Sequence, residues 1–416
     1  MTIKQTDVLI VGAGPAGLAS ALELKRQGLA NVTVVDRETE AGGMPRLCHH
    51  TGFGVWDFHR LYSGPKYARR YVQQALAAGV EIYTATTITG WNNTGSLTYT
   101  DPEGTGSITA RAILLATGCR ERPRAARLIP GKRPQGIFTT GSLQRFVDER
   151  RLPVGKRAVI VGAEIVSLSA FMTLKGAGLD VAALITDLPQ PQFYFPYQPM
   201  KWALLDMTSR TPIFTSSRVS RILGSRRVEG VELVHLQTGQ RETIACDALV
   251  FTGNWIPEHE VAREGNLAMN SGTRGPQIDA QFRTSQPGVF AAGNLLRGVE
   301  TAATSAMEGR YAARHIHQFL ERNGWPARQL PLEVESPLMW VFPNSVSASD
   351  EPPAGGFSFR VEQFLQNATL QVRQGNKTLH SQMFRRLMPN HTINLNGNWQ
   401  AKLDFNAEAP KIVLTG

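Results

Sequence analysis

One glycine pattern near the start of the chain constrains the fold more than any other feature of the sequence. Four apolar residues, Val8–Val11, have the pattern of a buried strand and run directly into Gly12-Ala-Gly14-Pro-Ala-Gly17. An apolar-periodic segment follows and closes at Gly28, which is a helix-stop signal. The sequence therefore predicts a strand, a tight turn and a helix.

This succession is typical of a dinucleotide-binding turn. Gly12 permits the turn, Gly14 lets the backbone approach a pyrophosphate, and Gly17 lets the helix pack close to the strand. Free N–H groups and the helix dipole favour phosphates at the helix N-terminus. A second predicted strand, Asn31–Val35, ends in Asp36, which stands 24 residues (36 − 12) after the first glycine, where a ribose-hydroxyl acceptor belongs. We expect a dinucleotide site rather than a phosphate-free glycine turn.

The same pattern recurs in the middle of the chain in a damaged form. The apolar segment Arg157–Val161 runs into Gly162, but Glu164 stands where the backbone must approach a pyrophosphate, and Ser167 replaces the packing glycine. A carboxylate at a helix N-terminus is itself the anion that the dipole favours, and it repels a phosphate. We therefore expect a degenerate second fold in which Glu164 occupies its own phosphate site.

Several predicted strands end in small residues and glycine. They end in Ala116-Thr117-Gly118, in Thr252-Gly253 and in the segment Gly288–Asn294, where a backbone can approach a nucleotide, although such endings alone are weak signals. Past Gly324–Pro326 the pattern changes to short alternating runs divided by Pro, Gly and Asn. This change predicts an all-β module of about ninety residues at the end of the chain.

Composition limits the possible functions. The 416 residues are too many for one ordinary core, and 42% hydrophobic with 19% charged residues is a globular balance. The three cysteines, Cys48, Cys119 and Cys246, form no CxxC and no metal spacing, which excludes a dithiol centre within the chain and a cysteine-ligated cluster. No apolar run is long enough for a membrane span, so we expect a cytoplasmic protein.

The net charge of +10 is partly local. Arginines and a lysine gather between Arg120 and Arg133. This segment is either a solvated basic loop or a docking surface for an anionic substrate, a cofactor phosphate or a partner. Stacking aromatics are not interleaved with these charges, so nucleic acid is not an expected partner.

Taken together, these residues resemble the flavoproteins with two dinucleotide-binding domains, the broad class of thioredoxin reductase and its relatives. The resemblance implies an α/β fold class with two Rossmann-like folds, the second nested in the first, plus the C-terminal β module. It implies an FAD-binding domain over 1–120 and 255–325, a degenerate NAD(P)-binding-like domain over 121–254, and a β-sandwich-like module over 326–416.

A closer resemblance lies in the motifs Gly42–Gly54, Gly64–Arg69 and Val161–Ala170. These motifs are similar to those of the FAD-containing subunits of hydrogen cyanide synthase, opine oxidases and heteromeric proline or hydroxyproline dehydrogenases, and of NADH-oxidase-like proteins linked to glycerol 3-phosphate metabolism. The similarity covers about residues 1 to 325. Many of those subunits carry a cysteine-rich iron–sulfur module, which this sequence lacks, and the β module matches no function.

The resemblance also assigns site residues. By the resemblance, Cys48 and His50 belong to a loop that runs near the flavin. In this chain they are the candidate catalytic pair, a thiolate and its base, or else a buried cysteine with a hydrogen-bonded histidine in a structural loop. Glu300 and Thr301 begin a helix that abuts the flavin ring in that class, where a helix N-terminus would stabilise the anionic reduced flavin. The alternative is that these two residues only cap the helix. Asn294 stands where the class usually has Asp. The expected FAD-binding residues are Gly12, Gly14, Pro15, Ala16, Gly17, Asp36, Arg37, Gly43, Ala116, Thr117, Gly118, Gly293, Asn294, Thr301 and Ala302.

The sequence thus favours an FAD-dependent oxidoreductase that acts on a small molecule, such as an amino or imino acid or an opine, and passes electrons to a partner, a quinone or oxygen. Two alternatives stay open: an NAD(P)H-dependent flavin reductase or oxidase, and a non-catalytic flavin- or ADP-binding subunit of a larger dehydrogenase complex. NAD(P) or an adenine nucleotide is the expected ligand of the second fold. We expect a second subunit or a homo-oligomer, and no metal.

Overall fold

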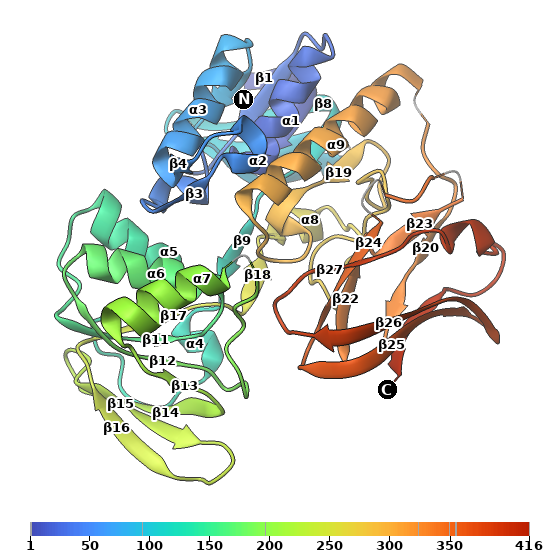
Figure 1. The fold of residues 1–416 in the computed structure, drawn as a ribbon. Coiled ribbons are helices and arrows are strands. Elements are labelled where there is room, and N and C mark those ends of the chain that lie inside the picture. The colour runs from blue at the N-terminus through green and yellow to red at the C-terminus, as the bar shows by residue number, and fades with distance from the viewer. Residues whose placement is uncertain are drawn as a thin grey trace. The chain divides into compact units, whose positions relative to one another are not determined.

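The chain leaves its first compact unit, builds a second one and then returns to the first. The computed structural model describes residues 2–93, 95–195, 197–322, 324–348, 350–353 and 356–415 (Figure 1). The first unit comprises Met1–Arg46, Gly52–Cys119 and Pro257–Gly416, and the second comprises Leu47–Thr51 and Arg120–Ile256. The predicted nesting of one nucleotide-binding fold within the other is therefore present.

The first unit is built on a mixed sheet in which parallel strands surround the glycine turn. Val8 pairs with Val32 and Ala112, and Val289 pairs with Ile113, all in parallel register. The carboxyl ends of these strands consequently meet at one edge of the sheet, which is where ligands bind in open α/β folds. The strands, in pairing order, are β5 (Glu81–Tyr83), β2 (Val32–Val35), β1 (Thr2–Val11), β8 (Gly104–Leu115), β7 (Ser96–Asp101) and β6 (Thr87–Asn93), with β19 (Val289–Ala291) beside β8.

Helices cover this sheet, and two of them cross closely. α1 starts at Pro15, whose fixed φ suits the first helical position. A Cβ on Gly309 of α9 would lie 2.0 Å from the backbone oxygen of Ala16, so only glycine permits this crossing. The helices of the unit include α1 (Pro15–Arg26), α2 (Val55–Phe58), α3 (Gly64–Ala77), α8 (Glu260–Glu264) and α9 (Ala302–Arg322).

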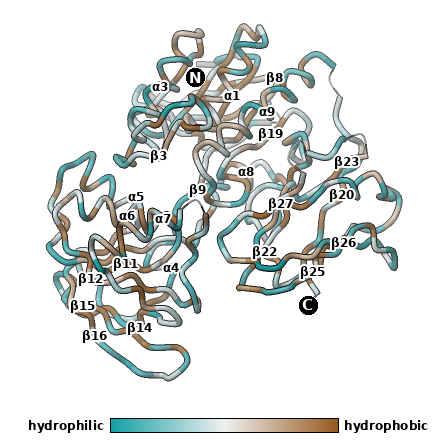
Figure 2. Tube along the Cα trace, in the orientation of Figure 1, coloured by the Kyte–Doolittle hydropathy of each residue, from teal (hydrophilic) through white to brown (hydrophobic). Residues whose placement is uncertain are grey.

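The second unit repeats the parallel architecture around the turn at Gly162. Ala158, Val159 and Ile160 of β11 are fully buried and pair with strands on both sides. Figure 2 shows apolar residues gathered in the strands and helix of this core. The sheet order is β10 (Ile137–Thr139), β17 (Ala248–Phe251), β11 (Arg157–Val161), β12 (Asp180–Ile185) and β13 (Ile213–Phe214); α4 (Arg124–Arg127), α5 (Thr140–Gln144), α6 (Ile165–Gly176) and α7 (Gln198–Lys201) are its α-helices, and β14 (Ser217–Leu223), β15 (Gly230–His235) and β16 (Arg241–Ala245) form an antiparallel sheet.

The last segment of the chain is rich in β-strands, as predicted. Trp399 and Phe357 stack in its own core with ring centroids 4.7 Å apart. Trp340 and Phe342 instead join the core of the nucleotide-binding sheet. The strands are β20 (Gln329–Pro331) with β23 (Ser345–Ser347); β22 (Leu338–Phe342), β24 (Phe357–Val361) and β27 (Ile393–Leu395); and β21 (Glu333–Val334), β28 (Lys411–Thr415), β25 (Leu365–Gln374) and β26 (Lys377–Leu387).

Candidate functional site

The turn after β1 leaves open space beside the second glycine of its pattern, Gly14. Gly12 has a φ of +113°, and a Cβ there would lie 2.3 Å from the backbone oxygen of Ala116. A Cβ on Gly17 would lie 1.9 Å from the backbone oxygen of Gly12. A Cβ on Gly14 would meet no atom within 4 Å. Gly14 therefore borders open space at the start of α1, and among the described residues no side chain caps this helix.

Asp36 braces the turn from the end of β2. Its Oδ2 accepts a hydrogen bond of 2.6 Å from the backbone N–H of Ala13, and its Oδ1 accepts one of 2.9 Å from that of Glu38. Burial raises the pKa of Asp36, while the two backbone donors lower it. A carboxylate oxygen can accept more than one hydrogen bond, so Asp36 retains acceptor capacity for a ribose hydroxyl beside the turn.

Glu258 joins three of the predicted residues, and sequence reasoning missed it. The Thr117 hydroxyl donates to the Glu258 backbone oxygen at 2.6 Å, and the Glu258 N–H donates to the oxygen of Gly118 at 2.9 Å. The Glu258 carboxylate accepts a hydrogen bond of 3.2 Å from Arg37. No signal in the sequence pointed to this residue, because Glu258 follows the second unit and lies far along the chain from its partners.

Gly43 and Gly293, two more of the predicted FAD residues, pack beside the same turn. A Cβ on Gly43 would lie 2.8 Å from the Cα of Gly14, and one on Gly293 would lie 2.8 Å from the Cβ of Ala16. Asn294 Oδ1 accepts hydrogen bonds from the N–H of Glu300 at 2.9 Å and the hydroxyl of Ser305 at 3.1 Å. Asn294 thus ties the segment after β19 to the start of α9.

The start of α9 is held by the C-terminal β module. Glu300 Oε1 accepts hydrogen bonds from Arg360 Nη2 at 2.7 Å and from the Thr392 hydroxyl at 2.6 Å. The same Arg360 nitrogen donates to the Val299 oxygen at 2.9 Å. Thr301 Oγ1 accepts from the N–H of Thr304 at 3.2 Å, so Thr301 caps the helix. No sequence pattern predicts this contact between the module and α9.

The turn of the second unit is filled by protein. Gly162 has a φ of +140°, and a Cβ there would lie 2.9 Å from Glu164 Oε2; one on Gly253 would lie 3.4 Å from Glu164 Oε1. The Glu164 side chain is buried, and neither oxygen makes a hydrogen bond of ordinary geometry to the described residues. Burial raises the pKa of Glu164 to about 7. The carboxylate therefore occupies the crevice between the two strand ends.

Cys48 and His50 contact residues of the second unit. The Cys48 thiol donates to Gln144 Oε1 at 3.7 Å, and His50 Nε2 lies 2.8 Å from the Ser169 hydroxyl. Burial raises the pKa of the Cys48 thiol to about 12 and lowers the pKa of His50. A nucleophilic thiolate needs the opposite shift in the thiol pKa. The catalytic role of this pair stays a prediction, and the geometry favours the structural interpretation.

The basic segment Arg120–Arg133 uses two of its arginines internally. Arg124 Nη2 donates to the oxygens of Ile129 at 3.1 Å and Gly131 at 2.9 Å. Arg127 Nη2 donates to the oxygens of Thr252 at 2.9 Å and Gly253 at 3.1 Å. A docking role for the segment stays a prediction. The described residues contain no cluster of metal-binding side chains and no helix with the length and apolarity needed to span a membrane.

Comparisons with known proteins place these features in context. The model of the pyridine nucleotide-disulphide oxidoreductase family matches residues 6–309. The alpha chain of sarcosine oxidase from Rhizobium meliloti is 25% identical over 324 residues, which cover 74% of this chain and only 29% of that protein. An opine oxidase subunit of Agrobacterium tumefaciens is 26% identical, with 74% of this chain and 64% of that protein covered. Thioredoxin reductase of Treponema pallidum is 25% identical, and the match covers 76% of this chain and 97% of that protein.

Two solved structures share the fold. T. acidophilum thioredoxin reductase superposes with a TM-score of 0.64 at 22% identity and covers 76% of this chain and 98% of its own. L-proline dehydrogenase from P. horikoshii gives a TM-score of 0.58 at 20% identity and covers 79% of this chain and 58% of its own. The predicted α/β architecture with two nucleotide-binding folds is confirmed.

Proposed function

Because the chain belongs to the pyridine nucleotide-disulphide oxidoreductase family, we propose that it binds FAD at the Gly12–Gly17 turn and oxidises a small molecule. The family consists of flavin oxidoreductases that bind FAD and NAD(P). The open space beside Gly14 carries the proposal, since it lies against an uncapped helix start. A pyrophosphate there would accept hydrogen bonds from the free N–H groups of α1.

The residues around the turn have separate roles in this proposal. Gly12 and Gly17 keep the strand and helix close, Asp36 braces the turn and offers its remaining acceptor capacity to the ribose, and Asn294 fixes the start of α9. The N-terminus of α9 carries a partial positive charge that favours a neighbouring anion. Bound FAD supplies the hydride acceptor, and the chain's own residues hold and orient it.

The proposed substrate is an amino or imino acid, an opine or a similar compound. Relatives named sarcosine oxidase and opine oxidase support this class, as does the fold shared with an L-proline dehydrogenase. Thioredoxin reduction is disfavoured, because the sequence has no CxxC to relay electrons from a flavin. We propose that the electrons pass to a quinone, to oxygen or to a second subunit.

The second fold is proposed not to deliver electrons from NAD(P)H. Glu164 fills the crevice of the second turn, whereas Gly14 leaves the corresponding space of the first turn open. The Glu164 carboxylate would repel a phosphate when ionised. An adenine nucleotide that avoids the turn remains compatible with this fold. NAD(P)H-dependent reduction of the flavin is the second candidate function, favoured by the similarity to thioredoxin reductase.

Anaerobic mixing of the purified protein with proline, sarcosine and octopine tests the proposal. The flavin absorbance is followed, and the nucleotide released by heat is identified. We expect FAD, and saturable bleaching by at least one of these compounds. A protein that neither holds nor takes up FAD would refute the cofactor proposal, whereas an FAD-loaded protein that no amine bleaches would refute the proposed substrate class.

A further inference from the structure

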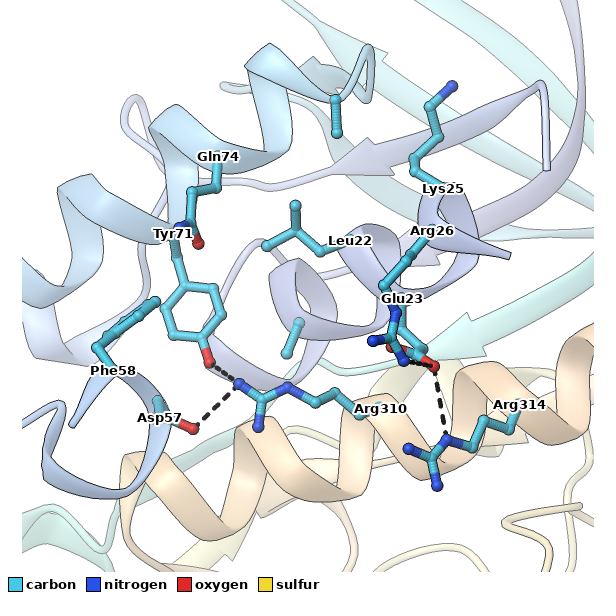
Figure 3. Close-up of a pocket in the computed structure, with 12 residues that line it drawn as sticks. Leu22, Glu23, Lys25, Arg26, Asp57, Phe58, Tyr71, Gln74, Arg310 and Arg314 are labelled. Carbon is cyan, nitrogen blue, oxygen red and sulfur yellow. Dashed lines mark hydrogen bonds and ion pairs between the residues drawn. The ribbon is translucent and has the colours of Figure 1, made fainter. Parts of the chain in front are cut away.

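A groove of about 750 Å³ runs along the C-terminal half of α1, whereas the FAD turn lies at the N-terminal end of that helix (Figure 3). Four helices contribute to it. Its walls combine apolar side chains with charged ones, and it opens to solvent. The lining includes Leu22, Phe58, Lys25, Arg26, Arg310 and Arg314.

The two acidic side chains of the groove are already paired. Asp57 accepts hydrogen bonds from the Tyr67 hydroxyl at 2.6 Å and from Arg310 at 3.2 Å. Glu23 lies 2.9 Å from Arg26 and 3.5 Å from Arg314, as the dashed lines in Figure 3 show. The four lining cations therefore exceed the carboxylates that they neutralise.

This excess extends over the helices that form the groove. α1, α2, α3 and α9 carry Lys25, Arg26, Lys66, Arg69, Arg70, Arg310, Arg314 and Arg322 against Glu23, Asp57, Glu308 and Glu321. Glu308 is buried and paired with Arg297, which removes it from the balance of this face. A face of this charge attracts an acidic partner and opposes the same face of a second copy of the chain.

An exposed tryptophan directly precedes two residues that line the groove, Asp57 and Phe58. Trp56 of α2 is 84% exposed, and its neighbours Val55 and Leu61 are 44% and 63% exposed. Helix α2, which carries Trp56, is held in place by Phe58, whose ring packs on that of Tyr71 with centroids 4.9 Å apart. The Tyr71 hydroxyl in turn accepts a hydrogen bond of 2.6 Å from Arg310. Three exposed apolar side chains in the short segment 55–61 favour an interaction surface there, and tryptophan and arginine dominate the binding energy of such surfaces.

We propose that the groove and Trp56 form the docking surface for a partner subunit that presents an acidic segment with an apolar side chain. The apolar side chain enters beside Leu22 and Phe58, and the carboxylates meet Arg26 and Arg314. This inference rests on the proposed function, in which electrons leave the flavin for a second subunit. The groove combines its charge with apolar lining residues, Leu22 and Phe58, whereas the segment Arg120–Arg133 is the rival surface that the test separates from it.

The test starts from the native complex purified from the protein's own host. The partner is separated and its affinity for the FAD-loaded chain is measured by surface plasmon resonance. We expect Trp56→Ala to raise Kd by about 30-fold or more. Arg314→Gln should lower the association rate and weaken its salt dependence. Lys132→Glu, an exposed change in the other basic segment, is the matched control and should stay within about twofold of wild type.

Each outcome decides the proposal. Flavin absorbance and the thermal midpoint establish that each variant is folded. If the partner binds Trp56→Ala and Arg314→Gln as tightly as wild type, or loses affinity only for Lys132→Glu, the groove is not its docking surface. The proposed oxidoreductase function would stand in either case. Variants that lose affinity for phosphatidylglycerol vesicles but not for the partner would make this face a membrane surface and overturn the proposal. If no partner exists, the inference falls, and bleaching by substrate still tests the function.

Discussion

The two glycine turns of this chain share a backbone conformation but differ in the space that they enclose, which is open in the first turn and filled by a side chain in the second. Gly12 and Gly162 both adopt a positive φ, and each follows a buried parallel strand beside a second strand end. Gly14 borders open space, whereas Glu164 places a buried carboxylate at the corresponding point. The backbone of the turn is therefore shared, and the side chain at the position of Gly14 and Glu164 differs.

The third position of the pattern teaches the same lesson. No side chain fits at Gly17, because a Cβ would lie 1.9 Å from the oxygen of Gly12. Ser167 fits in the second unit, and its hydroxyl donates to the oxygen of Glu164 at 2.5 Å. The second helix therefore leaves more room beside its strand. What separates the two turns is side-chain volume and charge.

The largest expected effect comes from making the first turn resemble the second. Gly14→Val should abolish FAD binding, because the side chain would enter the space of the pyrophosphate, yet the fold should survive since a Cβ meets nothing there. Gly176→Val is the matched control, because that site is equally open and lies at the end of α6. The measurements are flavin absorbance per chain and the circular dichroism spectrum. A yellow Gly14→Val protein would show that the turn does not hold FAD.

The start of α9 depends on its contact with the C-terminal β module. Arg360→Leu should lower the free energy of unfolding by about 1.5–3 kcal/mol, because it removes a charged hydrogen-bond donor to Glu300 and leaves Arg297 at 3.6 Å and Thr392 as the remaining partners of that carboxylate. Urea unfolding of the FAD-loaded protein measures this loss. The control is Arg373→Leu, because this exposed arginine of β25 donates to Gln371 of its own strand. Equal stability of both variants would contradict a stabilising contact between Arg360 and the start of α9.

The second turn should show a pH dependence of its own. The pKa of Glu164 is raised from 4.5 to about 7, so the folded state binds more protons than the unfolded state between these values. Stability contributed by the protonated form is therefore present below the lower value and is lost as pH rises toward 7. Glu164→Gln should be more stable than wild type at pH 8, by on the order of 3 kcal/mol, and this difference should shrink at pH 5.

Urea unfolding at both pH values measures this difference. Glu103→Gln, in an exposed turn, is the control and should change stability little at either pH. A destabilised Glu164→Gln at pH 8 would mean that the ionised carboxylate has a stabilising partner, which contradicts a carboxylate buried without one.

The smallest effect is expected at Cys48, which belongs to the second unit. Cys48→Ser should change the turnover of an accepted substrate by less than about threefold, because a thiol with a pKa of about 12 supplies little thiolate at neutral pH. Iodoacetamide labelling of the native protein should accordingly be slow at Cys48. A loss of turnover of 100-fold or more, about 2.7 kcal/mol, would restore the nucleophilic role.

The sequence predicts what depends on local spacing. The residues Gly12, Gly14, Gly17 and Asp36 act through a turn and two adjacent strands, so their arrangement is visible in the order of the residues. The departure of the second copy from the pattern is visible for the same reason, because Glu164 stands at the position that corresponds to Gly14. The all-β pattern at the end of the chain likewise follows from strand periodicity.

Tertiary contacts between distant segments are beyond such patterns. Glu258 reaches Arg37 across 221 positions, and Arg360 reaches Glu300 across 60, with no motif to connect them. The charge of Arg120–Arg133 suggested an open surface, but hydrogen bonds to nearby backbone oxygens occupy Arg124 and Arg127. Burial, which sets the pKa of Cys48, also depends on the assembled fold.

The most direct test of the contrast between the turns is stopped-flow reduction of the FAD-loaded protein by NADH and NADPH. The account predicts slow or absent bleaching of the wild-type flavin, and faster, saturable bleaching after Glu164→Gly, which removes the carboxylate from the second crevice. Rapid saturable reduction of the wild-type protein at micromolar NAD(P)H would contradict it, because the second fold would then be a working nicotinamide site despite Glu164.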